Sequence, residues 1–325
     1  NELVRIAKVV HSHGGIYASH MRDEGDELLE AIDETIEIGR RARLPVHVSH
    51  FKSSKRRNWG KVRAAARRIE EARAEGLRVT ADQYPYNASS TGIDAMLLPD
   101  GEREGGTAAT VARLKSAEEG PRLREMVAAN LEARGPIMIA SIKDHPTWVG
   151  KLLTEVAQNE GMELIDVAWE VLLTGGAAGV SFSMDENDVR YVMTLPYVAT
   201  ASDGSTKIDD GSKPHPRSFG TFPRKIGRYA LGEGAASLET AVRSCSGLPA
   251  DILGLEDRGY LEPGFLADVV VFNPEELMDR ATFESPFEVS VGVERVIVNG
   301  RTAVIAGEFQ DEYAGRPLRR VSVGK

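Results

Sequence analysis

The chain has 325 residues, of which 42% are hydrophobic and 27% are charged, as in ordinary globular proteins with a sizeable core. The formal net charge of −9 argues against nucleic acid or an anionic membrane as the main partner, and no apolar run approaches the ~20 residues that span a bilayer. A single cysteine, Cys245, excludes an intramolecular disulfide and a zinc site made of several cysteines, and we interpret it as a small buried filler.

The first stretch, NELVRIAKVV, has the pattern of an amphipathic helix that is already under way at Asn1. We therefore expect the chain to be the C-terminal portion of a longer protein. Any signal peptide would then lie upstream of Asn1, so the sequence leaves the compartment open, with the cytoplasm favoured.

Short apolar strands then alternate with amphipathic helices at intervals of about 30 residues, which predicts a parallel sheet. The first strand, IYASH, ends at His20 and precedes a helix with Leu28, Ile32 and Ile36 on one face. The strand VHVSH ends at His50, and a second helix leads to the strand RVTADQYPY.

The alternation of strands and helices is interrupted over residues 99–176, which we interpret as an insertion. It resumes with the strands GVSFSM and PYVATASDG. The pattern predicts five barrel strands ending near His20, His50, Tyr84, Met184 and Asp203. Residues 1–253 would thus form a partial barrel. Residues 254–325 read as purely β, with an Asn299-Gly300 hairpin turn, and would form a small separate module.

Three of the seven histidines, His11, His13 and His20, lie within ten residues. Strand alternation predicts that His20 and His50 point inward at the carboxyl edge of the barrel, where such folds build active sites, and that His47 points outward to the helices. Two imidazoles there could share one zinc ion, although a lone histidine at a strand end is more often structural. His11 and His13 belong to the opposite rim.

Asp203 follows the apolar strand YVATA and should face the same mouth. A carboxylate beside a metal site can take a proton from the attacking water and pass it to a leaving nitrogen, whereas the alternative for Asp-Gly is a simple turn. In the loop that follows, Arg217 and Arg224 are candidates to grip a substrate carboxylate, with surface ion pairs as the alternative.

Several segments together resemble the N-acyl-D-amino-acid deacylases (D-aminoacylases) of the amidohydrolase superfamily. The resemblance covers almost the whole chain in consistent order, and it rests on the stretches YASHMRDEGDELLEAIDE, VHVSHFK, DQYPYNASST, TASDG, PHPRSFGTFPR and GYLEPGFLADVVVFNP. It implies a TIM-like α/β barrel with an insertion and a small β-sandwich assembled from both chain ends, of which residues 254–325 would form half.

The resemblance also implies site residues and a cofactor. Zn²⁺ would be held by a cysteine and two histidines, the latter matching His20 and His50, and the catalytic aspartate matches Asp203. Arg217 matches the arginine that binds the substrate α-carboxylate, with Lys52, Tyr84 and Ser90 as its helpers. The partner would be a small N-acyl-D-amino acid.

The family's own His-x-His and its cysteine ligand would lie upstream of Asn1, and Cys245 is in the wrong place to replace it. The chain should therefore hold about five of eight barrel strands, fold poorly, bind zinc weakly and need the N-terminal segment for activity. Members selective for acidic side chains carry an arginine after YPYxAxST; here the segment GIDAMLLP has no basic residue, which favours an apolar or mixed side chain.

Two rivals remain open at this stage. A hydantoinase or dihydroorotase would be expected to bridge two metals with a carboxylated lysine, and neither IYASH nor VHVSH ends in one. The other rival is a non-catalytic barrel remnant that serves as a binding or assembly module.

Overall fold

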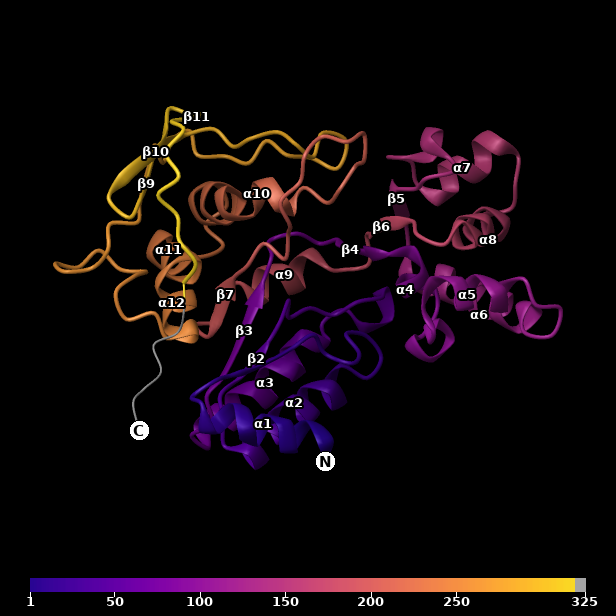
Figure 1. Cartoon of the computed structure of the whole chain (residues 1–325), viewed down its shortest axis with the longest axis horizontal. Helices are drawn as coiled ribbons and strands as arrows, with labels where there is room; N and C mark the ends of the chain where they lie inside the picture. Colours follow the sequence, from indigo (N-terminus) through magenta and orange to yellow (C-terminus); the bar gives the residue numbers. More distant parts are fainter. Residues whose placement is uncertain (319–325) are drawn as a thin grey trace.

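The computed structural model describes residues 1–318, and its central feature is a four-stranded parallel sheet with the strand order β1-β2-β3-β7 (Figure 1). Its strands are β1 (Tyr17–Ser19), β2 (Val46–Val48), β3 (Val79–Gln83) and β7 (Val198–Thr200). Ser19 is in register with Val48, and Val48 with Ala81. Because the strands are parallel, their carboxyl ends meet at one edge of the sheet.

Three helices belong to this part of the chain: α1 (Glu2–Ser12), α2 (Leu28–Ala42) and α3 (Lys61–Ala74). The apolar faces of α2 and α3 pack on β2 and β3 in one cluster of fully buried side chains, which includes Leu28, Ile32, Val62 and Ile69. This is the helix-on-parallel-sheet layer that the alternating pattern predicts.

The direction of the β2 side chains differs from the prediction. Val46 and Val48 pack in the cluster with α2 and α3, so they face the helices. His47 lies on the other face, where its ring nitrogens are 2.8 Å from Thr80 Oγ1 and 2.7 Å from Asp82 Oδ2. The expectation that His47 points outward was therefore wrong, because the valines and not the histidine occupy the face that the helices cover.

The prediction that GVSFSM forms the fourth strand of the parallel barrel was also wrong. Residues Ala178–Ser181 form β6, which pairs antiparallel with β4 (Ser89–Gly92) and β5 (Ile137–Ser141) in a separate sheet ordered β4-β6-β5. The parallel sheet thus holds four strands among residues 1–318 and not five. A short apolar run does not reveal its partner, which explains the error.

The segment between β3 and β7 has a core of its own. Its apolar residues run from Ile93 to Ala177, so it is wider than the predicted insertion of residues 99–176 and is closed by β4 and β6. Figure 1 shows it set to one side of the parallel sheet. Its helices are α4 (Ile93–Leu97), α5 (Gly106–Leu114), α6 (Gly120–Arg134), α7 (Leu153–Glu160) and α8 (Leu164–Thr174).

After β6 the chain returns through α9 (Glu186–Val192) to β7. A run of helices follows: α10 (Arg217–Pro223), the π-helical η4 (Arg224–Gly232), α11 (Leu238–Cys245) and α12 (Gly247–Leu253). No helix among residues 1–318 has both the length and the apolar character needed to cross a bilayer.

The C-terminal part forms an antiparallel sheet of β8 (Val269–Phe272), β9 (Val293–Val298), β10 (Arg301–Ile305) and β11 (Glu308–Phe309). Asn299 and Gly300, with φ of 49° and 79°, make the turn between β9 and β10, as the Asn-Gly pair predicts. The last seven residues of the predicted module, 319–325, lie outside the described part of the chain.

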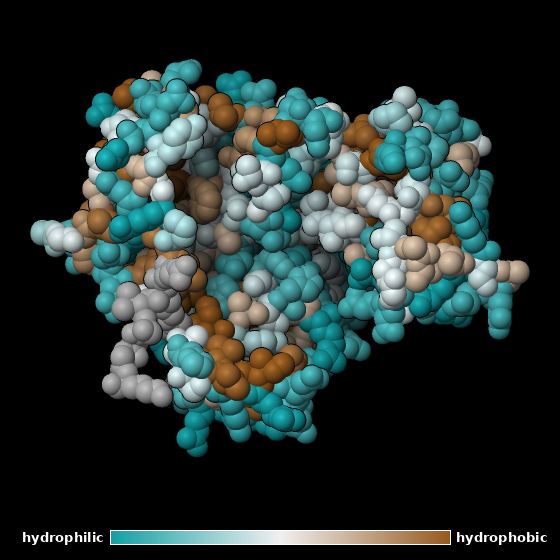
Figure 2. Space-filling model, viewed as in Figure 1, coloured by the Kyte–Doolittle hydropathy of each residue, from teal (hydrophilic) through white to brown (hydrophobic). Residues whose placement is uncertain are grey.

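Each of the outer strands, β1 and β7, has a single partner within residues 1–318, so the parallel sheet is open in the part described. Leu3, Ile6 and Val9 are exposed on α1, and Figure 2 shows hydrophobic residues gathered where α1 and α2 lie in Figure 1. The eight-stranded closure implied by the resemblance remains a prediction.

Gly227 shows how the segment before β9 is held against the helices. It lies in η4, and a Cβ at this position would stand 1.9 Å from the Leu277 carbonyl oxygen. We expect Gly227→Ala to lower the free energy of unfolding by roughly 2–3 kcal/mol, because backbone cannot move aside as a side chain can. Urea unfolding followed by circular dichroism measures this change.

Gly176→Ala is the matched control, since no atom lies within 4 Å of the Cβ it would add. It should change the free energy of unfolding by less than about 1 kcal/mol. Equal stabilities of the two variants would contradict the close approach of η4 and Leu277.

Candidate functional site

All seven residues that the sequence indicates for the site line one open cavity of about 610 Å³. The cavity lies at the carboxyl edge of the parallel sheet, and part of its wall comes from the insertion. The predicted residues that line it are His20, His50, Lys52, Tyr84, Ser90, Asp203 and Arg217.

The two histidines contact each other directly. His20 Nδ1 lies 2.8 Å from His50 Nε2, and the ring centroids are 4.7 Å apart. Burial lowers the pKa of His20, which favours the neutral imidazole that binds metals. Nitrogen ligands stand about 2.0–2.1 Å from zinc. Two ring nitrogens this close could therefore face one ion, so the donor set fits the predicted metal.

His50 and Asp203 reach the cavity through an unusual backbone. Both have positive φ, 40° for His50 and 46° for Asp203. Continued alternation would have placed His50 on the same face as Val46 and Val48, which pack against the helices. The left-handed residue after the end of β2 turns the imidazole toward His20 instead. The inward direction of His50 was predicted, but alternation along the strand was the wrong reason.

Glu24 is the main site residue that the sequence reasoning missed. Its carboxylate pairs with the buried Lys52 ammonium, and Oε1 lies 2.6 Å from His50 Nδ1. Burial alone would raise the pKa of Glu24, but the Lys52 charge and the His50 hydrogen bond lower it to about 2. The cluster of acids four residues after His20, in HMRDEGDE, was the available clue.

Glu24 is better placed to orient His50 than to bind a metal beside it. The ligand atoms of His20, Glu24 and His50 lie within 4.8 Å of one another. However, Glu24 contacts Nδ1 of His50, whereas His20 contacts Nε2 on the other side of the same ring. A carboxylate only accepts hydrogen bonds, whereas the Lys52 ammonium, 2.9 Å from the same Nδ1, can only donate. The shorter Glu24 contact, at 2.6 Å, favours a proton on Nδ1 and an Nε2 lone pair directed at His20.

Asp203 and Arg217 form a second ion pair in the cavity lining. Arg217 Nη1 lies 2.8 Å from Asp203 Oδ2, and Arg217 Nη2 donates to the Ser90 carbonyl at 3.4 Å. The guanidinium also lies over the Tyr84 ring, 4.7 Å from its centroid. Burial raises the pKa of Tyr84, so its phenol stays neutral near pH 7. The predicted base and the predicted carboxylate-binding group are thus neighbours.

His215 holds Arg217 in this position. It is buried beside Tyr86, donates through Nε2 to the Ala88 carbonyl at 3.0 Å, and accepts the Arg217 backbone N–H at 3.0 Å. Burial lowers the pKa of His215 to about 3, so the ring remains neutral and can accept. This histidine is a positioning residue for the first turn of α10.

The other candidates from the sequence lie elsewhere. Arg224 binds Asp279 at 2.9 Å, which makes it a link to the C-terminal segment, and of these two candidates Arg217 is the one that lines the cavity. His11 and His13 are exposed at the end of α1, and neither lines the cavity. Cys245 lies beside Thr200, where burial raises the pKa of its thiol.

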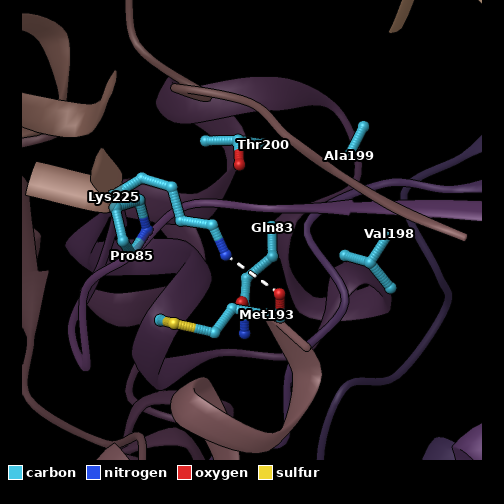
Figure 3. Close-up of a pocket in the computed structure, with 7 residues that line it drawn as sticks. All are labelled: Gln83, Pro85, Met193, Val198, Ala199, Thr200 and Lys225. Atoms are coloured by element: carbon cyan, nitrogen blue, oxygen red, sulfur yellow. Dashed lines mark hydrogen bonds between the residues drawn. The ribbon is translucent and has the colours of Figure 1, made fainter. Parts of the chain in front are cut away.

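A second pocket, too tight to hold a water molecule, lies between β3, β7 and η4 (Figure 3). Lys225 points into it and donates to the Met193 carbonyl at 2.9 Å. Burial lowers the pKa of Lys225 to about 8. The other lining side chains are apolar or uncharged, so this cavity offers no second group for acid–base or metal chemistry.

Comparison with known proteins gives these residues a context. Residues 175–304 match the model of the amidohydrolase family. A D-aminoacylase from Alcaligenes xylosoxydans xylosoxydans is 37% identical over 99% of this chain and 58% of its own length. An N-acyl-D-glutamate deacylase from the same organism is 35% identical over 98% of this chain and 57% of its own length.

Solved structures of enzymes with the same names superpose on this chain. A crystal structure of a D-aminoacylase superposes with a TM-score of 0.79 at 34% identity, covering 98% of this chain and 59% of that one. The N-acyl-D-glutamate deacylase of Bordetella bronchiseptica, complexed with zinc and a phosphonate inhibitor, gives 0.76 at 33% identity, covering 93% and 56%.

Residues 175–304 thus carry the pattern of the amidohydrolase family, whose TIM-barrel fold agrees with the parallel sheet and its outer helices. The chain is a homologue of the D-aminoacylases and N-acyl-D-glutamate deacylases. The chain spans about 58% of the length of the D-aminoacylase it matches.

The orienting role of Glu24 can be tested through metal affinity. We expect Glu24→Gln to weaken zinc binding by roughly 10- to 100-fold, because the amide can donate to Nδ1 and so favour the wrong tautomer of His50. Competition with a chromogenic chelator measures the dissociation constant. Glu34→Gln removes a carboxylate that pairs with the exposed Arg22, and it should leave zinc affinity unchanged. Equal affinities for wild type and Glu24→Gln would rule out this role.

Proposed function

We propose that the protein hydrolyses the amide bond of N-acyl-D-amino acids, giving a carboxylate and a free D-amino acid, with zinc as its cofactor. The observation that carries this proposal is the meeting of two facing imidazoles, a carboxylate and a guanidinium in one cavity. Homology to enzymes named as D-aminoacylases supports the same reaction class.

His20 and His50 would hold the metal through Nδ1 and Nε2, the two nitrogens that face each other. Zinc bound there would supply Lewis acidity toward the acyl carbonyl and make a water molecule acidic near pH 7. A zinc complex of the homologous N-acyl-D-glutamate deacylase supports this metal. A D-aminoacylase structure is described as having a binuclear metal centre, so the number of ions is a separate question.

Asp203 would carry the proton. Asp203 lines the same cavity as His20 and His50. In this position it can take the proton of the attacking water and give it to the departing amide nitrogen. The ion pair with Arg217 fixes the direction of the carboxylate before substrate arrives.

Arg217 and Lys52 would bind the α-carboxylate of the substrate. Arg217 is buried with one side of its guanidinium on Tyr84, so its planar donors have a fixed direction. Nearby, Glu24 raises the pKa of Lys52 against the opposing effect of burial, so this lysine stays charged. With the α-carboxylate held by these cations and the amide at the imidazoles, the D configuration would determine which way the side chain projects.

The third metal ligand is part of the proposal. The family pattern assigns it to a cysteine, and among residues 1–318 the cavity lining contains none. We propose that a segment outside this chain supplies it. Zinc content measured with and without the N-terminal region of a homologous D-aminoacylase would test this; equal zinc content would argue for a site complete within the chain.

Substrate assays separate this function from the cyclic-amide alternative. Dihydropyrimidinase from Brevibacillus agri shares 15% identity at a TM-score of 0.50, which is a likeness of fold alone. The runs IYASH and VHVSH end in His20 and His50, and neither ends in the lysine expected of a bridged two-metal site. We expect release of D-methionine from N-acetyl-D-methionine and no ring opening of hydantoin, measured by amine detection and chromatography. The opposite preference would reject the proposal.

Asp203→Asn should reduce kcat by at least roughly 1,000-fold while zinc content stays constant, because the amide cannot accept the proton of water. Steady-state kinetics together with atomic absorption measures both. Asp209→Asn, in the exposed loop after Asp203, is the matched control and should retain wild-type turnover. Substantial turnover by Asp203→Asn would refute the role of Asp203 as base.

A further inference from the structure

The cavity wall contains a cation that the proposed reaction does not use. Arg134 ends α6, in the insertion, and lines the same cavity as His20 and His50. The helix reaches this wall because α6 packs against the short 3-10 helix η1 (Arg56–Asn58) in the loop after β2. Arg134 lies outside every segment that carries the family resemblance.

The other cations of the cavity wall are paired with carboxylates. Arg22 contacts Glu34 at 2.5 Å, Lys55 contacts Asp26 at 2.9 Å, and Arg217 contacts Asp203 at 2.8 Å. The two remaining pairs are Lys52 with Glu24 and Arg103 with Asp100.

Arg134 differs from these cations. In the described part of the chain it has no carboxylate within ion-pair distance, whereas Arg103 has Asp100. The buried Nε atoms of both arginines lack a hydrogen-bond acceptor, so the missing carboxylate is what distinguishes Arg134. Burial lowers the pKa of the guanidinium, an effect that the charges of Glu24 and Asp23 partly oppose. Arginine nevertheless keeps its charge at neutral pH. A half-buried cation with free donors on a cavity wall is an anion site by its chemistry.

We propose that Arg134 binds the side-chain carboxylate of the substrate, so that the preferred substrates are N-acyl derivatives of acidic D-amino acids. This inference rests on the proposed function and gives its substrate class. The α-carboxylate is assigned to Arg217 and Lys52, and the amide to the imidazole pair, so the second anion of the substrate is the group left for Arg134. The relatives named for N-acyl-D-glutamate and N-acyl-D-aspartate deacylation, 35% and 33% identical, show that such substrates occur among homologues.

The inference changes the preference expected from the sequence. The segment GIDAMLLP, residues 92–99, has no basic residue, which favoured an apolar or mixed side chain. In three dimensions the cation comes from a position some forty residues further along the chain, at the end of α6. A motif comparison restricted to the segment after β4 could not find it.

The test compares isosteric substrates in wild type and three variants. Wild type should hydrolyse N-acetyl-D-glutamate with a kcat/KM at least tenfold above that for N-acetyl-D-glutamine. Arg134→Gln should lower kcat/KM for N-acetyl-D-glutamate by roughly 10- to 100-fold, mainly through KM, and leave N-acetyl-D-glutamine unchanged. Arg134→Lys, which keeps the charge, should restore part of the preference.

Arg103→Gln is the matched control, because it removes a cation from the same wall that Asp100 already neutralises. It should leave the ratio of the two substrates unchanged. Equal loss in Arg103→Gln and Arg134→Gln, or equal loss on both substrates, would overturn the assignment. A dependence on Arg134 that appears only with N-succinyl-D-glutamine would also overturn it, since the second anion would then belong to the acyl group.

Calorimetric binding of N-acetyl-D-glutamate and N-acetyl-D-glutamine distinguishes this inference from the proposed function. Tighter binding of the glutamate compound that is lost in Arg134→Gln, without hydrolysis of either compound, would support the anion site and reject the hydrolase. Hydrolysis of both compounds without a preference would support the hydrolase and reject the anion site.

Discussion

The site depends on one backbone constraint, the left-handed conformation of His50 and Asp203 at the ends of two strands. A non-glycine residue in this region costs on the order of 1–3 kcal/mol, so the surroundings must hold it there. For His50 the contacts are visible: its N–H donates to Asp82 at 2.7 Å and its ring contacts Glu24 at 2.6 Å. Because of this conformation, the His50 imidazole points away from the sheet face that the helices cover and contacts His20 instead.

Charge compensation explains why so many ionisable groups can line one cavity. A buried ammonium or carboxylate is costly unless it is paired, and the Lys52–Glu24 pair satisfies both partners while it orients His50. Arg217 and Asp203 form the corresponding pair elsewhere in the cavity lining. In each pair, a residue of the proposed reaction contacts a side chain of opposite charge. Removing one partner therefore leaves the other with an unpaired charge and without the contact that holds its position.

Much of this arrangement could be predicted from the sequence, because the βα rhythm and the residues after each strand are local features. That His20, His50 and Asp203 share one cavity was predicted in this way, although the backbone turn that directs His50 into it was not. The pairing of β6 could not be predicted, since its four residues, AGVS, fit a parallel strand as well as an antiparallel one. Glu24 and Arg134 were missed because their roles depend on contacts made in three dimensions. The acids after His20 mark a polar loop but do not show which of them meets Lys52 and His50, and the last residue of a helix does not show that it lines the cavity.

The cavity lies between two independently packed cores, and this division has a physical consequence for specificity. The imidazoles follow strands whose core is shared with α2 and α3, whereas Ser90 and Arg134 belong to the insertion, with its own core from Ile93 to Ala177. Side chains at the end of α6 can therefore change without disturbing the packing that holds His20 and His50. A fold built in this way can keep the reaction constant on one wall and vary the recognised side chain on the other.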